Sequence, residues 1–178
     1  MEYRIDKTKF AGANTNTDSY GADYYKATFW VKFYDKKNDM YFYHVNLHYP
    51  VRTPSARDAY SELLIEYITK NFEGLPVVIT GDFNCTEDGW GCRHVDESII
   101  LDDTMTALPP EKRINWNYSS GSGYTPFEQK AKSVYKHIDH VYYTPSKIEV
   151  LTWWLDVETV NDGKYASDHH PITVKFYK

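Results

Sequence analysis

The sequence SDHHP occupies residues 167–171, directly before an apolar stretch, and GDFN occupies residues 81–84, directly after another. Each motif places a carboxylate and a polar partner where a buried strand is expected to meet a loop. Such positions commonly carry metal and phosphate chemistry, because the strand fixes the group and the loop exposes it. NLH at residues 46–48 ends a third apolar stretch, and HIDH at residues 137–140 opens a fourth. The four motifs predict a polar site built from strand ends.

The composition is that of one globular domain with a sizeable core: 178 residues, 42% of them hydrophobic and 25% charged. Aromatic residues make up 17% of the chain, which favours a β-rich protein because rings pack well on pleated surfaces. The formal net charge of −5 gives no support for tight non-specific binding to nucleic acid, which usually needs a basic face. The sequence shows no signal peptide and no apolar run of membrane-spanning length, so localisation stays undetermined.

Apolar periodicity predicts several strands and one helix. The helix is expected to begin at Thr53 and Pro54 and to end at Gly74, with apolar residues at three-and-four spacing along one face. The segment 85–123 is predicted to be mostly irregular, with a short helix near residues 97–101. Strands are expected at residues 27–34, 40–47, 76–80, 138–143, 148–154 and 172–177. A mostly β chain with one crossover helix is typical of an α/β (α+β) sandwich.

The two cysteines, Cys85 and Cys92, lie in the same predicted loop. A local disulfide and two free thiols in a reducing compartment are equally compatible with the sequence. Their spacing is not that of a CxxC metal knuckle, so they do not indicate a thiolate metal site.

In their order along the chain, the motifs N-x-H, GD-x-N, ID-x-(I/V) and SDH-x-P resemble those of the endonuclease/exonuclease/phosphatase superfamily. The resemblance covers essentially the whole chain. It implies a DNase I-like four-layer sandwich, in which two mostly antiparallel sheets face each other and are flanked by helices. Residues 1–178 would then form a single domain.

One part of the family pattern has no counterpart here. Family members begin with strands followed by a Gln-Glu pair whose glutamate binds the metal. Glu2 follows no apolar strand and does not match that glutamate. The chain is therefore expected to be N-terminally truncated, corresponding to about the C-terminal two-thirds of a domain of this family, whose members exceed typical domain length.

The resemblance implies a nuclease-like phosphoesterase that hydrolyses phosphodiester bonds with Mg²⁺, or Mn²⁺, as cofactor. Asp168 would bind the metal. His169 would be the general base, because imidazole titrates near neutrality. Asp82 would orient the attacking water or bind a second metal, and Asn84 would contact the phosphate or the metal.

Two further residues complete the expected site. His48 would donate a hydrogen bond to the phosphate, and Asp139 would hold the catalytic imidazole in one tautomer. On an extended segment, Asp82 and Asn84 would face the same pocket. The structural alternatives are an Asx-type turn at Asp82 and Asn84, and a surface aspartate at the start of a strand for Asp139.

The histidine spacing raises the alternative of a zinc site. His44 and His48 lie four residues apart, and His137 and His140 lie three apart. On a strand, positions four apart separate the rings by roughly 13 Å. The expected strands therefore disfavour a zinc site.

For the substrate, nucleic acid is expected ahead of phospholipid, with a sphingomyelinase-like lipid phosphodiesterase as the alternative. An inactive fragment or binding module is the alternative from a different class, because the family glutamate has no match. No stable protein partner is implied. Strands left without neighbours by truncation would favour association through their edges, and the chain alone is expected to be catalytically weak.

Overall fold

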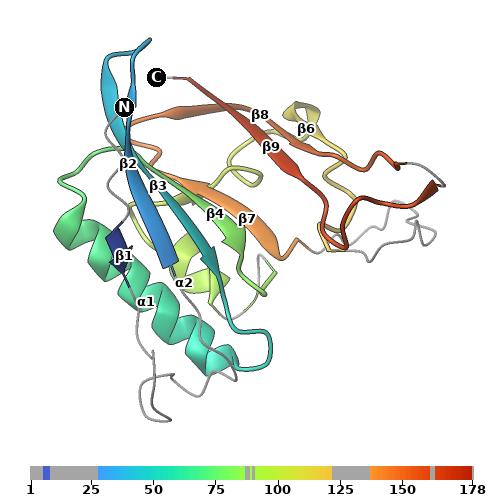
Figure 1. Cartoon of the computed structure of the whole chain (residues 1–178), viewed down its shortest axis with the longest axis horizontal. Coiled ribbons are helices and arrows are strands. Elements are labelled where there is room, and N and C mark those ends of the chain that lie inside the picture. Colours follow the sequence, from blue (N-terminus) through green and yellow to red (C-terminus); the bar gives the residue numbers. More distant parts are fainter. Residues whose placement is uncertain are drawn as a thin grey trace.

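The computed structural model describes residues 6–8, 28–86, 89, 91–121, 137–160 and 163–177. Its elements are, in chain order, β1 (Asp6–Thr8), β2 (Thr28–Asp35), β3 (Met40–His48), α1 (Pro54–Asn71), β4 (Val77–Asp82), α2 (Cys92–Asp96), β5 (Asp102–Asp103), the 3₁₀ turn η1 (Pro110–Lys112), β6 (Arg113–Ile114), β7 (Asp139–Tyr143), β8 (Glu149–Leu155) and β9 (Ile172–Tyr177). Sheet A has the strand order β1-β2-β3-β4-β7-β5, and sheet B has the order β6-β8-β9. Figure 1 shows the two sheets side by side, with α1 against sheet A.

The strands that carry three of the motifs form the centre of sheet A. β3 and β4 run parallel and are joined by α1, the crossover that a parallel pair requires. Leu64 and Ile68 of α1 are buried in one core with Val45 of β3 and Ile79 of β4. The opposite face of β4 and β7 packs on sheet B, where Tyr143 and the inward side chains of β8 and β9 form a second core. These two cores hold the ends of β3, β4 and β7 at fixed positions.

The mixed α/β architecture with two sheets confirms the predicted fold class. Within the described residues, three layers of the expected four are present: α1 with α2, sheet A and sheet B. Neighbouring strands are mostly antiparallel, and the β3–β4 and β6–β8 pairs are the parallel ones. The predicted strands appear within one residue or two of their expected bounds.

The segment between β4 and β7 differs from expectation. Its short helix, α2, lies at Cys92–Asp96 rather than near residues 97–101, where the chain forms turns. Ile99, in the middle of that expected helix, is 98% exposed. Cys92 is fully buried and forms a disulfide with Cys85, with 5.9 Å between the Cα atoms. The disulfide joins α2 to the segment that follows β4, and Val95 of α2, which is also fully buried, packs in the same core as Leu64 of α1.

Part of sheet A has no covering layer in the described residues. Phe29 of β2 is 43% exposed and lies on the same face as its neighbour Asn46. β9 is an edge strand of sheet B, paired only with β8 among the described strands. These are the surfaces through which the expected association would occur. No helix among the described residues is long and apolar enough to cross a membrane.

Candidate active site

Three strand ends place His48, Asp82 and Asp139 in one row across sheet A. His48 is the partner of Asp82 in the β3–β4 pair, and Asp82 is the partner of Asp139 in the β4–β7 pair. Residues directly opposite each other on neighbouring strands are about 5 Å apart and share a face of the sheet. The Nε2 atom of His48 lies 3.5 Å from Oδ2 of Asp82. The parallel β3–β4 pairing thus brings the motifs NLH and GDFN together, although a whole helix separates them along the chain.

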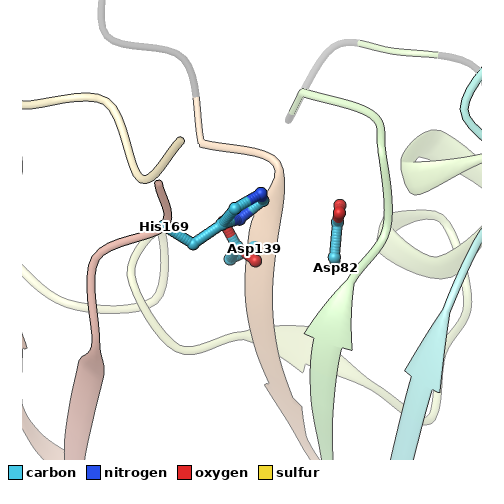
Figure 2. A group of neighbouring side chains, drawn as sticks. All are labelled: Asp82, Asp139 and His169. Carbon is cyan, nitrogen blue, oxygen red and sulfur yellow. The ribbon is translucent and has the colours of Figure 1, made fainter. Parts of the chain in front are cut away.

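His169 reaches this row from the segment that leads into β9 of sheet B. Its Nδ1 lies 2.8 Å from Oδ2 of Asp139, and Figure 2 shows the ring beside both Asp139 and Asp82. The Nδ1–H donates to the carboxylate, so in the neutral ring the lone pair is on Nε2. The structure therefore holds His169 in the tautomer that accepts a proton at Nε2.

The charges around His169 favour its protonated form. Burial alone would lower the pKa of His169, but the hydrogen bond and charge of Asp139, with the charge of Asp82, outweigh it and raise the pKa above its ordinary value. The pKa of Asp82 is also raised, first by burial and then by the nearby charge of Asp139, against the opposing hydrogen bond from the Asn84 amide. Two carboxylates that repel each other in this way form a site of negative potential.

This negative site has the donors for a divalent cation. Asp82, Asp139 and His169 each offer one ligand atom, and these atoms lie within 4.8 Å of one another. They form the one such group among the described residues. Its two partly buried carboxylates suit a hard cation such as Mg²⁺, which prefers oxygen and keeps several waters. The residues present therefore fit the metal that the motifs imply.

Asn84 does not lie on an extended segment, so the expectation that its side chain shares a face with Asp82 rested on a wrong premise. Its φ is +50°, in the left-handed region, and its N–H donates to Oδ1 of Asp82 at 2.8 Å. Its Nδ2 donates to the carbonyl of Tyr49 at 2.9 Å. The Asx-type turn, the structural alternative at this position, is thus present. It fixes the carboxylate of Asp82 and leaves Oδ2 directed toward His48.

Asp168 lies outside the group of potential metal ligands. The residue is exposed, and Ser167 Oγ donates to its Oδ1 at 3.3 Å. Its charge still contributes to the raised pKa of His169. The ligand role expected for Asp168 remains a prediction.

The histidines considered as zinc ligands each contact a different partner. His44 Nε2 lies 2.9 Å from Thr80 Oγ1, and His137 Nε2 lies 2.8 Å from the carbonyl of Trp116. His140 Nδ1 lies 2.8 Å from Asp103 Oδ2. Within the described residues, these histidines do not form a group of three or more potential ligands.

The close approach of β3 to β4 explains why the residue before Asp82 is glycine. A Cβ atom at Gly81 would lie 2.0 Å from the carbonyl oxygen of Leu47, its partner on β3, and φ is +156°. Any larger residue would force β3 and β4 apart at the point where they hold His48 and Asp82.

We expect Gly81→Ala to lower the free energy of unfolding by about 3 kcal/mol, because the added methyl group collides with backbone that cannot move away. Gly74→Ala is the matched control. Gly74 has φ +67°, and no atom lies within 4 Å of the position that the added methyl group would take, so only backbone strain of about 1 kcal/mol is expected there. Urea unfolding of both variants measures the difference, and equal losses would show that the contact with Leu47 is unimportant.

Sequence reasoning missed Ser120. Its hydroxyl accepts hydrogen bonds from the backbone at the start of β7, and it is fully buried. In the sequence it belongs to the polar run SSGS at residues 119–122, which has the composition of an exposed loop. No local pattern could have singled it out, because its partners lie 18 and 19 residues further along the chain.

The comparisons with known proteins agree with this architecture. The model of the Endonuclease/Exonuclease/phosphatase family matches residues 7–169. No curated protein sequence matches the chain. Among solved structures, an endonuclease/exonuclease/phosphatase family protein from Bacteroides thetaiotaomicron superposes with a TM-score of 0.72 at 22% identity, covering 87% of this chain and 57% of that one.

Two further structures show the same fold. A mannosyl-6-phosphatase from Bacteroides thetaiotaomicron has a TM-score of 0.70 at 22% identity, covering 88% of this chain and 59% of that one. D. rerio TDP2, complexed with single strand DNA product, has a TM-score of 0.68 at 14% identity, covering 100% of this chain and 68% of that one. The chain thus spans a little under 60% of the length of the two bacterial structures.

Proposed function

Because the chain belongs to the endonuclease/exonuclease/phosphatase family, we propose that it is a divalent-cation-dependent phosphoesterase that hydrolyses phosphodiester bonds. The observation that carries the proposal is the hydrogen bond between His169 and Asp139, 2.8 Å long, formed beside Asp82. An imidazole held by one carboxylate and facing a second is the arrangement that general-base activation of water needs.

In this reaction, His169 and each residue of the row have a defined task. Nε2 of His169 takes a proton from the attacking water, and Asp139 keeps the ring in the required tautomer and stabilises the imidazolium that forms. Asp82, anchored by the turn at Asn84, orients the water through a carboxylate oxygen. His48, whose side chain is 56% exposed, donates to a phosphate oxygen at the mouth of the site.

The carboxylates are also the residues that would hold Mg²⁺ or Mn²⁺. Asp82 and Asp139 would supply oxygen ligands. Asp168, next to His169 in the sequence, would add a further carboxylate. A bound cation supplies charge neutralisation for the phosphate oxygens as the negative transition state develops. The repulsion between Asp139 and Asp82, which helps to raise the pKa of Asp82, would be relieved by a positive ion held by these carboxylates.

Nucleic acid is the proposed substrate class, ahead of phospholipid. One structural neighbour, TDP2, was solved with a single strand DNA product, which is a property of that protein and supports the proposal only through the shared fold. The net charge of −5 argues against strong general attraction to polyanions, so recognition would depend on the local site.

The test is hydrolysis of a chromogenic phosphodiester, single-stranded DNA, RNA and sphingomyelin, each with Mg²⁺, with Mn²⁺ and with neither. We expect turnover to require one of these cations and to resist a zinc-selective chelator, because the group contains no thiolate. Mg²⁺ at about 100 times its Kd should also stabilise the fold by about 2.7 kcal/mol.

Asp82→Asn is the negative control. It removes a proposed metal ligand, so both the turnover and the stabilisation by Mg²⁺ should be lost. Stabilisation by Mg²⁺ without turnover on any of these substrates would contradict the enzyme and favour a binding module of the same fold. Preferential cleavage of sphingomyelin would show that the substrate class is lipid and not nucleic acid.

A further inference from the structure

We infer that Ser120 is the positioning residue of the His169–Asp139 pair, an inference that rests on the proposed function of that pair. Ser120 contacts the backbone on both sides of the pair, and it does so from a fully buried position.

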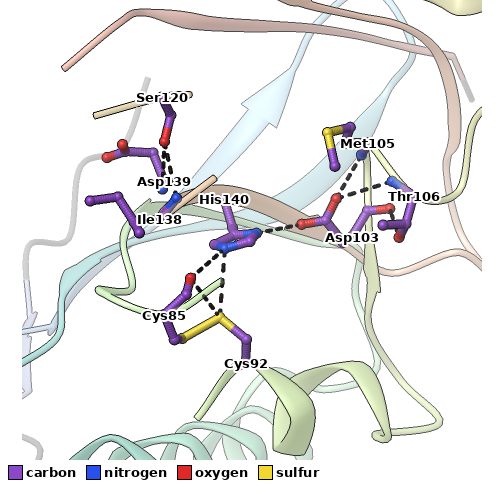
Figure 3. A network of polar contacts seen from close by, with 9 residues as sticks. All are labelled: Cys85, Cys92, Asp103, Met105, Thr106, Ser120, Ile138, Asp139 and His140. Carbon is purple, nitrogen blue, oxygen red and sulfur yellow. Dashed lines mark hydrogen bonds and ion pairs between the residues drawn. A yellow bond between two sulfur atoms is a disulfide. The ribbon is translucent and has the colours of Figure 1, made fainter. Parts of the chain in front are cut away.

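The first contact is with the strand that carries Asp139. The hydroxyl oxygen of Ser120 accepts hydrogen bonds from the backbone N–H groups of Ile138, at 3.0 Å, and Asp139, at 3.2 Å. Figure 3 shows the hydroxyl of Ser120 directed at these two amides. The pair formed by His140 and Asp103 lies on the other side of this backbone. One side-chain oxygen therefore fixes the backbone of Asp139.

The second contact is with the loop that carries His169. The carbonyl oxygen of Ser120 accepts a hydrogen bond from the N–H of His170 at 2.7 Å, and Gly121 forms an isolated β-bridge with His169. The backbone of residues 120–121 is thus joined to the segment before β9, while the hydroxyl of Ser120 is joined to the start of β7.

Such a link is needed because the two halves of the pair belong to different sheets. Asp139 begins β7 of sheet A, and His169 precedes β9 of sheet B. β5 pairs only with Tyr142 and Tyr143 of β7, so the strand ladder on that edge does not extend to Asp139. The hydroxyl of Ser120 takes the place of a neighbouring strand there and sets the distance between Asp139 and His169.

The experiment compares Ser120→Ala, Ser120→Thr and Ser119→Ala. Alanine removes the hydroxyl, threonine keeps it, and Ser119 is a neighbouring control whose hydroxyl donates to the carbonyl of Gly121. We expect Ser120→Ala to lower kcat roughly 10- to 100-fold with little change in KM, the size expected for a misplaced catalytic group. The other two variants should stay within about 3-fold of wild type.

A readout without substrate separates this inference from the proposed function. Long-range proton–nitrogen NMR, at a pH where the ring is neutral, reports the tautomer of His169. We expect the Nδ1–H tautomer in the wild type and in Ser120→Thr, and a mixture of tautomers in Ser120→Ala. The buried His140–Asp103 pair is an internal reference for folding, because it is held by other partners.

The outcomes are distinct. An altered His169 ring beside an unchanged His140 ring supports the role of Ser120, even if no phosphodiester is cleaved. An unchanged His169 ring in Ser120→Ala overturns it. Loss of the His140 signature together with that of His169, or failure of Ser120→Thr to restore the tautomer, also overturns it, because Ser120 would then serve only the fold.

Discussion

Replacing His169 with alanine should lower kcat/KM for the proposed phosphodiester hydrolysis about 10²- to 10⁴-fold, the range expected for loss of a general base. The reason is the geometry of the ring. Asp139 accepts the Nδ1–H of His169 at 2.8 Å and so leaves Nε2 as the proton acceptor. Without the imidazole, Asp82 is the remaining base beside the water, and a carboxylate is a much weaker one. The measurement is steady-state hydrolysis of a generic phosphodiester at saturating Mg²⁺.

His94→Ala is the matched control for this substitution. His94 belongs to α2 and lies 3.8 Å from Asp58 of α1, with a side chain 42% exposed. It should keep the wild-type rate within about 3-fold, as expected for a substitution at a partly exposed position away from the site. A His169→Ala rate as high as that of His94→Ala would refute the general-base role.

The strand ends could be predicted from the sequence because the signals for them are local. A polar motif next to an apolar stretch marks the start or the end of a strand wherever the strand lies, and β3, β4, β7 and β9 were all recognisable in this way. The order of the strands in the sheets, by contrast, was not predicted, because pairing between strands that are distant in sequence leaves no local signal. Residue pairing then places His48 beside Asp82, and Asp82 beside Asp139.

The features that could not be predicted depend on backbone conformation or on distant contacts. The inference that Asp82 and Asn84 face the same pocket assumes an extended backbone, in which side chains alternate between the two faces. It fails because Asn84 adopts the left-handed region, which asparagine tolerates, and the chain turns there. Ser120 is buried by residues far along the chain, which no local pattern records. The state of Cys85 and Cys92 depends on the path of the loop between them, so the sequence left it open and the structure joins them.

Replacing Asp139 with asparagine should lower kcat roughly 10³- to 10⁴-fold, a loss comparable to that of a triad aspartate. The amide can present its NH₂ group to Nδ1 of His169, which places the proton on Nε2 and removes the base. Asp102→Asn is the matched control, since Asp102 is exposed on β5 beside the far end of β7. At a Mg²⁺ concentration that saturates every variant, and so offsets the loss of an oxygen ligand at Asp139, the double variant with His169→Ala should be no worse than His169→Ala alone, within about 3-fold, if His169 and Asp139 act as a unit.

The pH dependence of Asp139→Asn provides an independent test with a defined sign. Burial lowers the pKa of His169, and the hydrogen bond and charge of Asp139 are the main influences that raise it. His169 acts as a base only when neutral, so wild-type activity falls as the pH drops through this raised pKa. Without the charge of Asp139 the pKa of His169 falls, and the acid limb of the residual activity moves to lower pH. Both pH profiles are measured at a Mg²⁺ concentration that saturates each protein, so that the difference between them reports the charge of Asp139 and not a difference in metal occupancy. An acid limb that stays in place, or moves to higher pH, would show that Asp139 does not set the protonation of the catalytic imidazole.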